Sequence, residues 1–332
     1  MRASTSATRP LLKWAGGKRQ LLPVLVSYYP QKFSRYIEPF MGSAAVFFDL
    51  LNSGRLARRT SILADVNPDL IGCYRTLRDR PGAVIRSLTL LAAQYREGGT
   101  ACYYDVRDLR FNPLRAALQA RATDPADVAD MYTPELAAML IFLNRTGFNG
   151  LFRLNRRGGF NVPVGRYTNP TICDEAHLRA VASALASPSV TLTLRPFDRT
   201  LAEAGEGDFV YCDPPYAPLS PTSSFANYTA DGFTSFDQRR LQQAVVAACG
   251  RGAHVIVSNS SATEVLQAYT TPEARKAKLQ VRPVPARRAI NSIASSRGPV
   301  NELIISNVRA ASLANVRPKM LRAGTRPRRK SA

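Results

Sequence analysis

The chain has 332 residues, 45% of them hydrophobic, and its 45 Lys and Arg against 24 Asp and Glu give a formal net charge of +21. This length suits one large or two ordinary domains, and the apolar content argues against a disordered chain. No apolar run approaches the ~20 residues that span a bilayer, and residues 1–10 lack the apolar stretch of a secretory signal, so the charge indicates a polyanionic partner, with nucleic acid the first candidate.

Apolar runs predict six buried strands, at residues 35–40, 61–65, 190–194, 208–212, 254–259 and 302–306. Helical patterns fall between several of them, at residues 44–51, 69–77, 237–248 and 261–269. Strands that alternate with helices predict an α/β fold with a parallel sheet.

The alternation stops between residues 77 and 189. This stretch predicts helices at residues 83–95, 134–143 and 174–185, with loops rich in Gly, Asn and Arg. We therefore expect a discontinuous domain formed by residues 1–76 and 190–308, with an inserted lobe at residues 77–189. Residues 309–332 show little periodicity and are expected to form a flexible basic tail.

The positive charge is concentrated in two parts of the chain. Residues 144–173 contain five arginines and no acid, and the chain from Val308 onward contains eight basic residues and no acid. Without that tail, 37 basic residues still outnumber the 24 acids, which leaves +13. A solvated basic surface is the alternative to a site for a polyanion.

The cysteines and histidines argue against a zinc site. No two cysteines have the Cys-x-x-Cys spacing, and the chain has only two histidines, His177 and His254, which we interpret as structural. An odd and scattered set of cysteines is typical of reduced thiols in a cytosolic protein. The five are Cys73, Cys102, Cys173, Cys212 and Cys249.

Two acidic residues lie in consecutive predicted strands near the N-terminus, Glu38 within the first and Asp65 at the end of the second. After Glu38, a tight turn with Gly42 leads into a helix, where the small residue and the free N–H groups permit a ligand to approach closely. Asp65 lies 21 residues after Ala44, and an acid at about this distance binds ribose hydroxyls in doubly wound nucleotide folds. The Gly-x-Gly-x-x-Gly pattern is absent, which favours a nucleoside over a pyrophosphate. A helix cap or a turn is the alternative role for Asp65.

The loop after the strand at residues 208–212 carries Asp213, Pro214, Pro215 and Tyr216. Prolines end strand pairing and fix φ, so this loop offers a carboxylate, a rigid carbonyl and an aromatic ring together. Two acceptors and a ring suit a planar amine such as that of adenine. The alternative is a proline-rich turn with a capping aspartate. Cys212 ends the buried strand, and we interpret it as a packing residue and not as a nucleophile.

Six segments carry a family resemblance: LKWAGGK (12–18), EPFMGS (38–43), LADVN (63–67), NRTGFNGLFR (144–153), GFNVPVGRY (159–167) and YCDPPYAPL (211–219). In content and order they resemble the Dam-type family of DNA adenine-N6 methyltransferases, over nearly the whole chain from Leu11 to about Asn307. The resemblance implies a site-specific enzyme with a Rossmann-like, SAM-dependent methyltransferase sheet. It further implies that residues 77–189 form a mostly helical DNA-recognition lobe.

The resemblance implies S-adenosylmethionine (SAM) as the cofactor. Asp213 and the Pro214 carbonyl are expected to accept the hydrogens of the adenine amine while its nitrogen attacks the sulfonium methyl in line, and Tyr216 to stack on the flipped base. Ala44 replaces a glycine that is usual in the family, which is tolerable if its φ is negative. The residues expected at the cofactor are Trp14, Lys18, Glu38, Phe40, Gly42, Asp65 and Asp213, and those expected in catalysis are Asp213, Pro214, Pro215 and Tyr216.

The lobe is expected to read duplex DNA, with GATC as the target that the resemblance suggests. Arg153 is expected to pair bidentately with a guanine and Lys13 to contact the other guanine, while Phe148 braces the gap left by the flipped base. Leu151 and Pro163 are expected to pack on pyrimidine edges. Further contacts to phosphates or bases are expected from Asn149, Asn155, Arg166 and Tyr167. For Arg156 and Arg157, phosphate anchoring and plain solvation are both open.

Two other functions stay open at this point: a DNA-binding protein without catalysis, and a methyltransferase for RNA adenine or a protein glutamine amide. The intact residues 213–216 and Asp65 disfavour the first. The acid-free stretch disfavours the second, and glutamine enzymes usually carry Asn in place of Asp213. Ser258 and Asn259 are expected either to shape the base pocket or to cap a strand. Residues 287–297 resemble a family loop that contacts the DNA backbone.

We expect a monomer without a metal or a membrane segment. We expect the protein in the cytoplasm of a bacterium, where it acts on DNA in the nucleoid. We expect it to be encoded by the bacterium or by a phage.

Overall fold

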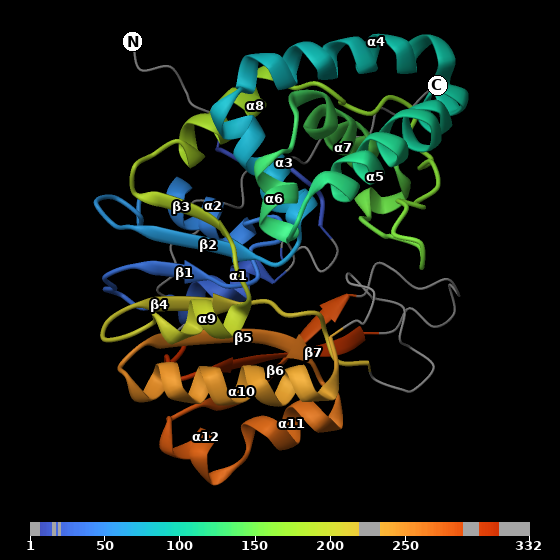
Figure 1. Cartoon of the computed structure of the whole chain (residues 1–332). Coiled ribbons are helices and arrows are strands. Elements are labelled where there is room, and N and C mark those ends of the chain that lie inside the picture. The colour runs from blue at the N-terminus through green and yellow to red at the C-terminus, as the bar shows by residue number, and fades with distance from the viewer. Residues whose placement is uncertain (1–6, 15–17, 19–20, 219–232, 288–298, 312–332) are drawn as a thin grey trace, which may run out of the picture.

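Seven strands form one sheet in the order β3-β2-β1-β4-β5-β7-β6 (Figure 1). The computed structural model describes residues 7–14, 18, 21–218, 233–287 and 299–311. Strands β1 to β5 pair in parallel, as the alternating pattern predicts, whereas β7 runs antiparallel between β5 and β6. The strands are β1 (Tyr36–Glu38), β2 (Ser61–Asp65), β3 (Val190–Leu194), β4 (Phe209–Cys212), β5 (His254–Ser260), β6 (Gln280–Arg287) and β7 (Pro299–Ser306).

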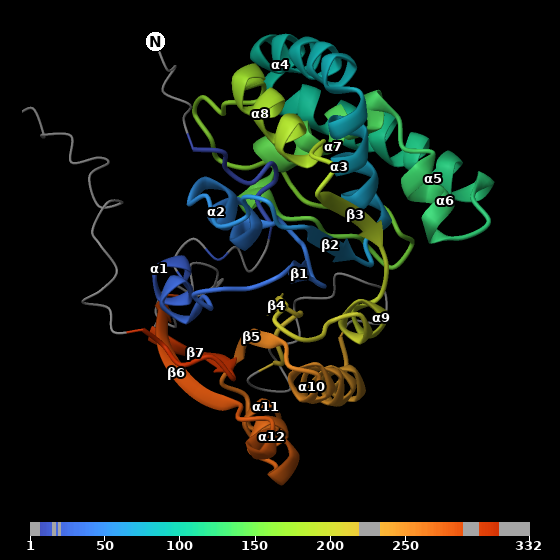
Figure 2. The same cartoon turned by 90° about the vertical axis from the view of Figure 1, so that its left-hand side faces the viewer.

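The two faces of the sheet belong to two apolar clusters. Along β4, Phe209 and Tyr211 point into one cluster, and Val210 and Cys212 into the other, because side chains alternate along a strand. Figure 2 shows helices on both sides of the strands. One side carries α1 (Leu22–Leu25), the 3₁₀ turn η2 (Val26–Tyr28) and α2 (Ala45–Asn52), and the other carries α9 (Phe197–Ala202), α10 (Ser235–Gly250), α11 (Thr263–Tyr269) and α12 (Pro272–Lys276).

The chain between β2 and β3 contains a series of helices, followed by a stretch without helix at residues 151–174 and then α8. Figures 1 and 2 both show its helices gathered at the β3 end of the sheet. Their buried side chains are continuous with the cluster on one face of the sheet. The helices are α3 (Pro68–Asp79), α4 (Pro81–Tyr104), the π-helix η3 (Asp105–Phe111), α5 (Asn112–Arg121), α6 (Pro125–Asp130), α7 (Pro134–Thr146), the 3₁₀ turn η4 (Phe148–Gly150) and α8 (Glu175–Leu185).

Several elements differ from the sequence prediction. Helical structure in α4 continues beyond the predicted end at residue 95 and is broken by a kink at Gly99, whose φ of 49° is not helical. Strand β6 was not predicted because Pro283 and Pro285 interrupt its pattern. It is the last strand of the sheet and pairs only with β7, and an edge strand is where prolines are tolerated. Helices α5, α6, α9 and α12 were also missed; all are short, at ten residues or fewer.

The parallel strands bring distant residues to one edge of the sheet. Glu38 ends β1, Asp65 ends β2 and Asp213 follows β4, so the three carboxyl groups lie at the same ends of neighbouring strands. Ligands of open α/β sheets bind at this edge.

Candidate active site

Asp213 lies in a chain of polar contacts at the end of β4. Its Oδ1 is 2.8 Å from the Lys18 ammonium, which is only 5% exposed. The same ammonium donates to the Tyr216 hydroxyl at 2.8 Å and lies 4.4 Å from the centre of the Tyr216 ring. The Tyr216 hydroxyl donates in turn to Glu302 Oε2 on β7, also at 2.8 Å. One residue near the N-terminus, two in the loop after β4 and one on β7 thus form one network.

Burial sets the protonation of this network. It raises the pKa of Asp213 to about 6, against the lowering effect of Lys18 and with a further rise from Glu302. At pH 7 the Asp213 carboxyl is therefore still mostly ionised and accepts hydrogen bonds. Burial also raises the pKa of Tyr216 well above its ordinary value, so its hydroxyl remains a donor.

Buried side chains of α10 and β5 fix the backbone of the loop. Gln238 Nε2 donates to the Pro215 carbonyl at 3.1 Å, and Asn259 Nδ2 donates to Gln238 Oε1 at 3.0 Å. Asn259 Oδ1 accepts from the backbone N–H of Ala217 at 3.3 Å. Within the described residues the Pro214 carbonyl has no hydrogen-bond partner. Side chains of α10 and β5 thus hold the backbone of the loop, and the Pro214 carbonyl stays available to accept a hydrogen bond.

A second group of residues surrounds Asp65 at the end of β2. Asp65 accepts from the backbone N–H of Gly42 and of Asn67, both at 3.0 Å. Burial raises the pKa of this carboxyl, and the backbone donors lower it. Gly42 has a φ of 46°, and a Cβ there would lie 3.0 Å from Trp14 Cδ1. Glycine is needed at this position both for its φ and for the space that the indole takes.

Ala44 does not meet the condition on which its tolerance was predicted. Its φ is 55° and its ψ is 37°, in the left-handed region that glycine adopts more readily. The residue is fully buried at the N-cap of α2. The methyl group therefore adds backbone strain to the loop that holds Gly42, at a cost of roughly 1–2 kcal/mol.

Glu38 and Phe40 lie at the end of β1. Glu38 is buried and its Oε2 accepts from the Tyr36 hydroxyl at 2.9 Å, and burial raises its pKa well above the ordinary value. Phe40 stacks on Phe197 of α9, with ring centres 5.3 Å apart, and contacts Phe233 edge to face. The contacts that the structure shows for Glu38 and Phe40 are thus with other parts of the protein, and they support the loop after β1 from the inside.

Asn144 joins the N-terminal motif to the end of α7. Its Oδ1 accepts from the Lys13 N–H at 2.8 Å, and its Nδ2 donates to the Lys13 carbonyl at 2.7 Å and the Gly150 carbonyl at 2.8 Å. The neighbouring Trp14 stacks on Phe152, with ring centres 5.5 Å apart. The Lys13 ammonium lies 4.4 Å from the centre of the Tyr167 ring. The residues predicted to bind cofactor and DNA are therefore adjacent in space as well as in sequence.

The acid-free stretch presents several of the predicted DNA contacts. Phe148 is 44% exposed, unusually high for a phenylalanine, and Asn149 next to it has a φ of 55°. Arg153 is exposed, and its guanidinium donates to the side chain and the carbonyl of Asn161 at 2.8 and 3.2 Å. Pro163 and Arg166 are exposed, while Leu151 and Tyr167 are half-buried.

Asn155 has a clear role inside its own loop. Its Oδ1 accepts from the backbone N–H of Arg157 at 2.9 Å and of Gly159 at 3.0 Å. Both bonds shape the turn, so any contact with DNA would fall to the opposite side of the same amide group.

Other predicted residues are structural where the structure describes them. Cys212 is fully buried with a strongly raised pKa, and desolvation lowers the pKa of the buried His177. Three partners were not predicted from the sequence: Glu302, Gln238 and Asn144. Their signal is weak because other polar residues stand beside each of them, so nothing in the sequence distinguishes them from residues in contact with solvent. The predictions for residues 15–17, Leu219, residues 288–297 and most of the basic tail lie outside the described residues.

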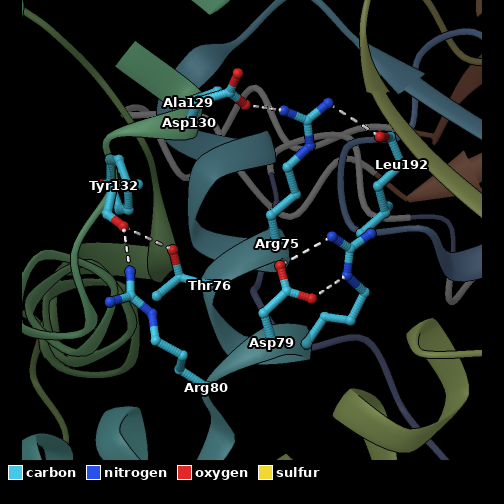
Figure 3. A pocket seen from close by; sticks show the side chains of 9 residues that line it. Arg75, Thr76, Asp79, Arg80, Ala129, Asp130, Tyr132 and Leu192 are labelled. Carbon is cyan, nitrogen blue, oxygen red and sulfur yellow. Dashed lines mark hydrogen bonds and ion pairs between the residues drawn. The ribbon is translucent and has the colours of Figure 1, made fainter. Parts of the chain in front are cut away.

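A cavity of about 410 Å³ lies away from this site, where α3 and α6 meet β3 (Figure 3). Its arginines already have partners: Arg75 contacts Asp130 and the Leu192 carbonyl, and Arg78 contacts Asp79. In the part of the chain that the structure describes, no helix is long and apolar enough to span a membrane. The same part holds no group of three or more His, Cys, Asp or Glu suited to a metal ion.

Comparison with known proteins identifies the family. Residues 14–282 match the model of the D12 class N6 adenine-specific DNA methyltransferases. The type II methyltransferase M1.LlaDCHI of Lactococcus lactis is 36% identical over 299 residues, which cover 90% of this chain and 95% of the relative. A DNA adenine methylase of Vibrio cholerae is 34% identical over 89% of this chain and 95% of the relative. The DNA N-6-adenine-methyltransferase of Escherichia phage P1 is 33% identical over 89% of this chain and 35% of the relative. The chain therefore belongs to the D12 class and is an adenine-specific DNA methyltransferase.

Proposed function

We propose that the enzyme transfers a methyl group from SAM to N6 of an adenine flipped out of duplex DNA, within GATC. The observation that carries this proposal is the loop after β4. It combines the ionised Asp213, the Tyr216 ring and the Pro214 carbonyl, which has no hydrogen-bond partner among the residues that the structure describes. Gln238 and Asn259 hold this loop in place. The DNA adenine methylases among the relatives support adenine in DNA as the acceptor. The resemblance of the recognition segments to the Dam-type family supports GATC as the target.

The residues around Asp65 fit SAM. Each Asp65 oxygen already accepts one backbone N–H and has a second lone pair for a ribose hydroxyl. Gly42 lets the Trp14 indole lie against the loop beside Asp65, because a Cβ there would be 3.0 Å from Trp14 Cδ1. These residues, with Lys18, Glu38 and Phe40 in support, would hold the cofactor, which supplies an electrophilic methyl group when bound.

The residues of the loop activate the amine without deprotonating it first. The lone pair of the adenine amine is delocalised into the ring, which makes it a poor nucleophile. Asp213 Oδ1 and the Pro214 carbonyl accept hydrogen bonds from its two hydrogens, so the nitrogen becomes tetrahedral and the positive charge that develops on it is stabilised. The methylated nitrogen then loses one of these hydrogens as a proton to solvent. The Tyr216 ring stacks on the flipped base and so fixes the plane of the base. The Lys18 ammonium now occupies Asp213 Oδ1 and lies beside the Tyr216 ring, so it must give up part of this contact when a base enters.

The helical segment between β2 and β3 supplies the DNA-reading surface in this proposal. We assign residues 1–76 and 190–308 to the catalytic domain and residues 77–189 to DNA recognition, with residues 309–332 adding salt-sensitive affinity. Flipping a base costs a few kcal/mol, and the exposed Phe148 ring is suited to fill the gap. Lys13, Leu151, Arg153 and Pro163 read bases, and Asn149, Asn155, Arg166 and Tyr167 hold the backbone or bases.

Transfer of labelled methyl groups to duplex oligonucleotides tests the function. GATC duplexes should be labelled at adenine, and duplexes with the site scrambled should not. Labelling of another adenine-containing site would replace GATC but leave the enzyme assignment intact. RNA or a glutamine peptide as the preferred acceptor would contradict the proposal, and so would DNA binding without any transfer.

Arg153→Ala is expected to relax recognition at one G·C pair of the target. Asn161 uses two of the five N–H donors of Arg153, so three remain for a guanine edge. Loss of a bidentate contact lowers discrimination by about 1–3 kcal/mol, or roughly 5- to 150-fold in kcat/KM between the target and a site changed at that pair. Arg156→Ala in the same loop is the control and should weaken all sites alike. An unchanged site preference in Arg153→Ala would refute the assignment.

A further inference from the structure

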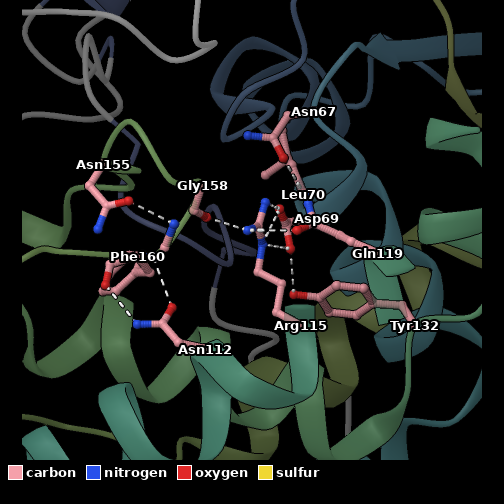
Figure 4. Close-up of polar contacts among 11 residues, drawn as sticks. Asn67, Asp69, Leu70, Asn112, Arg115, Gln119, Tyr132, Asn155, Gly158 and Phe160 are labelled. Carbon is pink, nitrogen blue, oxygen red and sulfur yellow. Dashed lines mark hydrogen bonds and ion pairs between the residues drawn. The ribbon is translucent and has the colours of Figure 1, made fainter. Parts of the chain in front are cut away.

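A buried ion pair connects the segment after Asp65 to the loop that carries Arg153 (Figure 4). Asp69 lies in the first turn of α3 and is 1% exposed, and Arg115 on α5 is 4% exposed. Arg115 Nε donates to both Asp69 oxygens at 2.8 and 2.9 Å, and its Nη2 lies 2.8 Å from Asp69 Oδ2. Asp69 thus holds the guanidinium in one orientation.

The third nitrogen of Arg115 reaches the recognition loop. Its Nη1 donates to the Gly158 carbonyl at 2.6 Å. Gly158 lies at the tip of a short hairpin, residues 154–160, which is closed by a bridge between Leu154 and Phe160. Gly158 has a φ of 78°. The other residues at the tip are a second glycine and two exposed arginines. The bond from Arg115 therefore restrains a part of the chain that has little packing of its own.

A second anchor holds the base of the same hairpin. Asn112 at the start of α5 donates to the Phe160 carbonyl at 3.0 Å and accepts from the Phe160 N–H at 2.8 Å. One position outside the bridge, Asn161 donates its N–H to the Arg153 carbonyl at 3.1 Å, and its side chain holds the Arg153 guanidinium. The orientation of the hairpin thus sets where Arg153 points.

Stability alone does not account for the ion pair. Removing two charges from water is costly, and apolar residues of similar volume often serve as well or better in a protein interior. What an apolar pair cannot supply is the bond to the Gly158 carbonyl. The fork of Arg115, fixed by Asp69, makes that bond directional.

We propose that Arg115, oriented by Asp69, is a positioning residue for sequence recognition that holds the 154–160 hairpin so that Arg153 meets its base. The proposal rests on the function proposed above, in which Arg153 reads a base pair. It places the anchor of the reading loop on α3, only four residues after the Asp65 carboxylate at the cofactor site. The buried pair thus links the hairpin to the segment that carries Asp65.

The test compares two variants of the full-length enzyme with a matched control. Asp69→Leu/Arg115→Met removes both charges and the bond to Gly158 while keeping an apolar fill. Arg115→Lys keeps a charge for Asp69 but loses the fork. The control is Arg75→Lys, because Arg75 also bridges an acid, Asp130, and a backbone carbonyl, that of Leu192, but does not contact the hairpin.

Both Arg115 variants should lower discrimination at the base pair read by Arg153 by about tenfold, with kcat on the target within about twofold because the Asp213 site is unchanged. Amide hydrogen exchange in residues 154–161 should become faster in both variants and stay unchanged in Arg75→Lys. Should one variant fail to fold, the other gives the same comparison. Unchanged discrimination or unchanged exchange, with Arg153→Ala relaxed, overturns the positioning role alone. If Arg153→Ala itself leaves site preference unchanged, the proposed reading role fails and this proposal fails with it.

Discussion

Asp213→Ala is expected to lower kcat for methyl transfer to DNA by at least about 1000-fold, while the Kd for DNA stays within about threefold. Removing one preorganised group that stabilises developing charge costs 10²–10³ in rate, and Asp213 supplies both a hydrogen-bond acceptor and a negative charge. The DNA-reading residues lie on other elements and keep their contacts. Single-turnover transfer and a binding titration with a GATC duplex measure the two quantities separately.

Two further measurements make this prediction specific. Because burial raises the pKa of Asp213 to about 6, kcat/KM of the parent enzyme should rise with pH up to about 6 and then level off, since only the ionised form accepts the amine hydrogens. Glu302→Gln removes the charge that contributes to this rise and should move the acid limb to lower pH. Loss of DNA binding in Asp213→Ala, or a pH profile that Glu302→Gln leaves in place, would contradict the role of this network.

The residues that we propose to contact a ligand are the ones that the sequence shows best. Asp65 and residues 213–216 follow apolar strands directly, so their position at one edge of a parallel sheet follows from the pattern. The parallel part of the sheet, β1 to β5, could be predicted for the same reason, but the antiparallel pairing of β7 could not. Ala44 shows the limit of such reasoning: the missing glycine is visible in the sequence, but the positive φ that makes it matter is a property of the folded loop.

The residues that hold these groups in place could not be predicted. Glu302 reaches Tyr216 across 86 positions of the chain, and Arg115 reaches Asp69 across 46. Nothing in the local pattern of either segment distinguishes these charges from solvated ones, because their partners are brought together only by packing. Strand β6 was missed for a related reason, since its two prolines are acceptable only at the edge of the sheet that the tertiary fold creates.

Asn144→Ala is expected to lower the free energy of unfolding of the enzyme by about 3 kcal/mol and to weaken the binding of both SAM and DNA. The substitution leaves the N–H and carbonyl of Lys13 and the Gly150 carbonyl without their partner, and each unsatisfied group in a buried setting costs roughly 1–3 kcal/mol. Because Lys13 and Trp14 are consecutive, loosening this segment moves a base contact and a cofactor contact together. Calorimetry should show Tm lowered by at least about 5 °C.

Asn52→Ala is the matched control, because Asn52 makes the same reciprocal pair of bonds to another N-terminal residue, Thr8, but at the exposed surface. Water can replace the lost hydrogen bonds at the surface. Asn52→Ala should therefore lower the free energy of unfolding by less than about 1 kcal/mol and leave the kinetics unchanged. At temperatures below its Tm, Asn144→Ala should show a raised KM for both SAM and DNA. Its kcat/KM should fall by a larger factor than KM rises. A lowered Tm with both KM values unchanged would mean that Asn144 only stabilises the fold. A raised KM for both substrates would instead show that one buried amide aligns the cofactor segment with the DNA-reading segment.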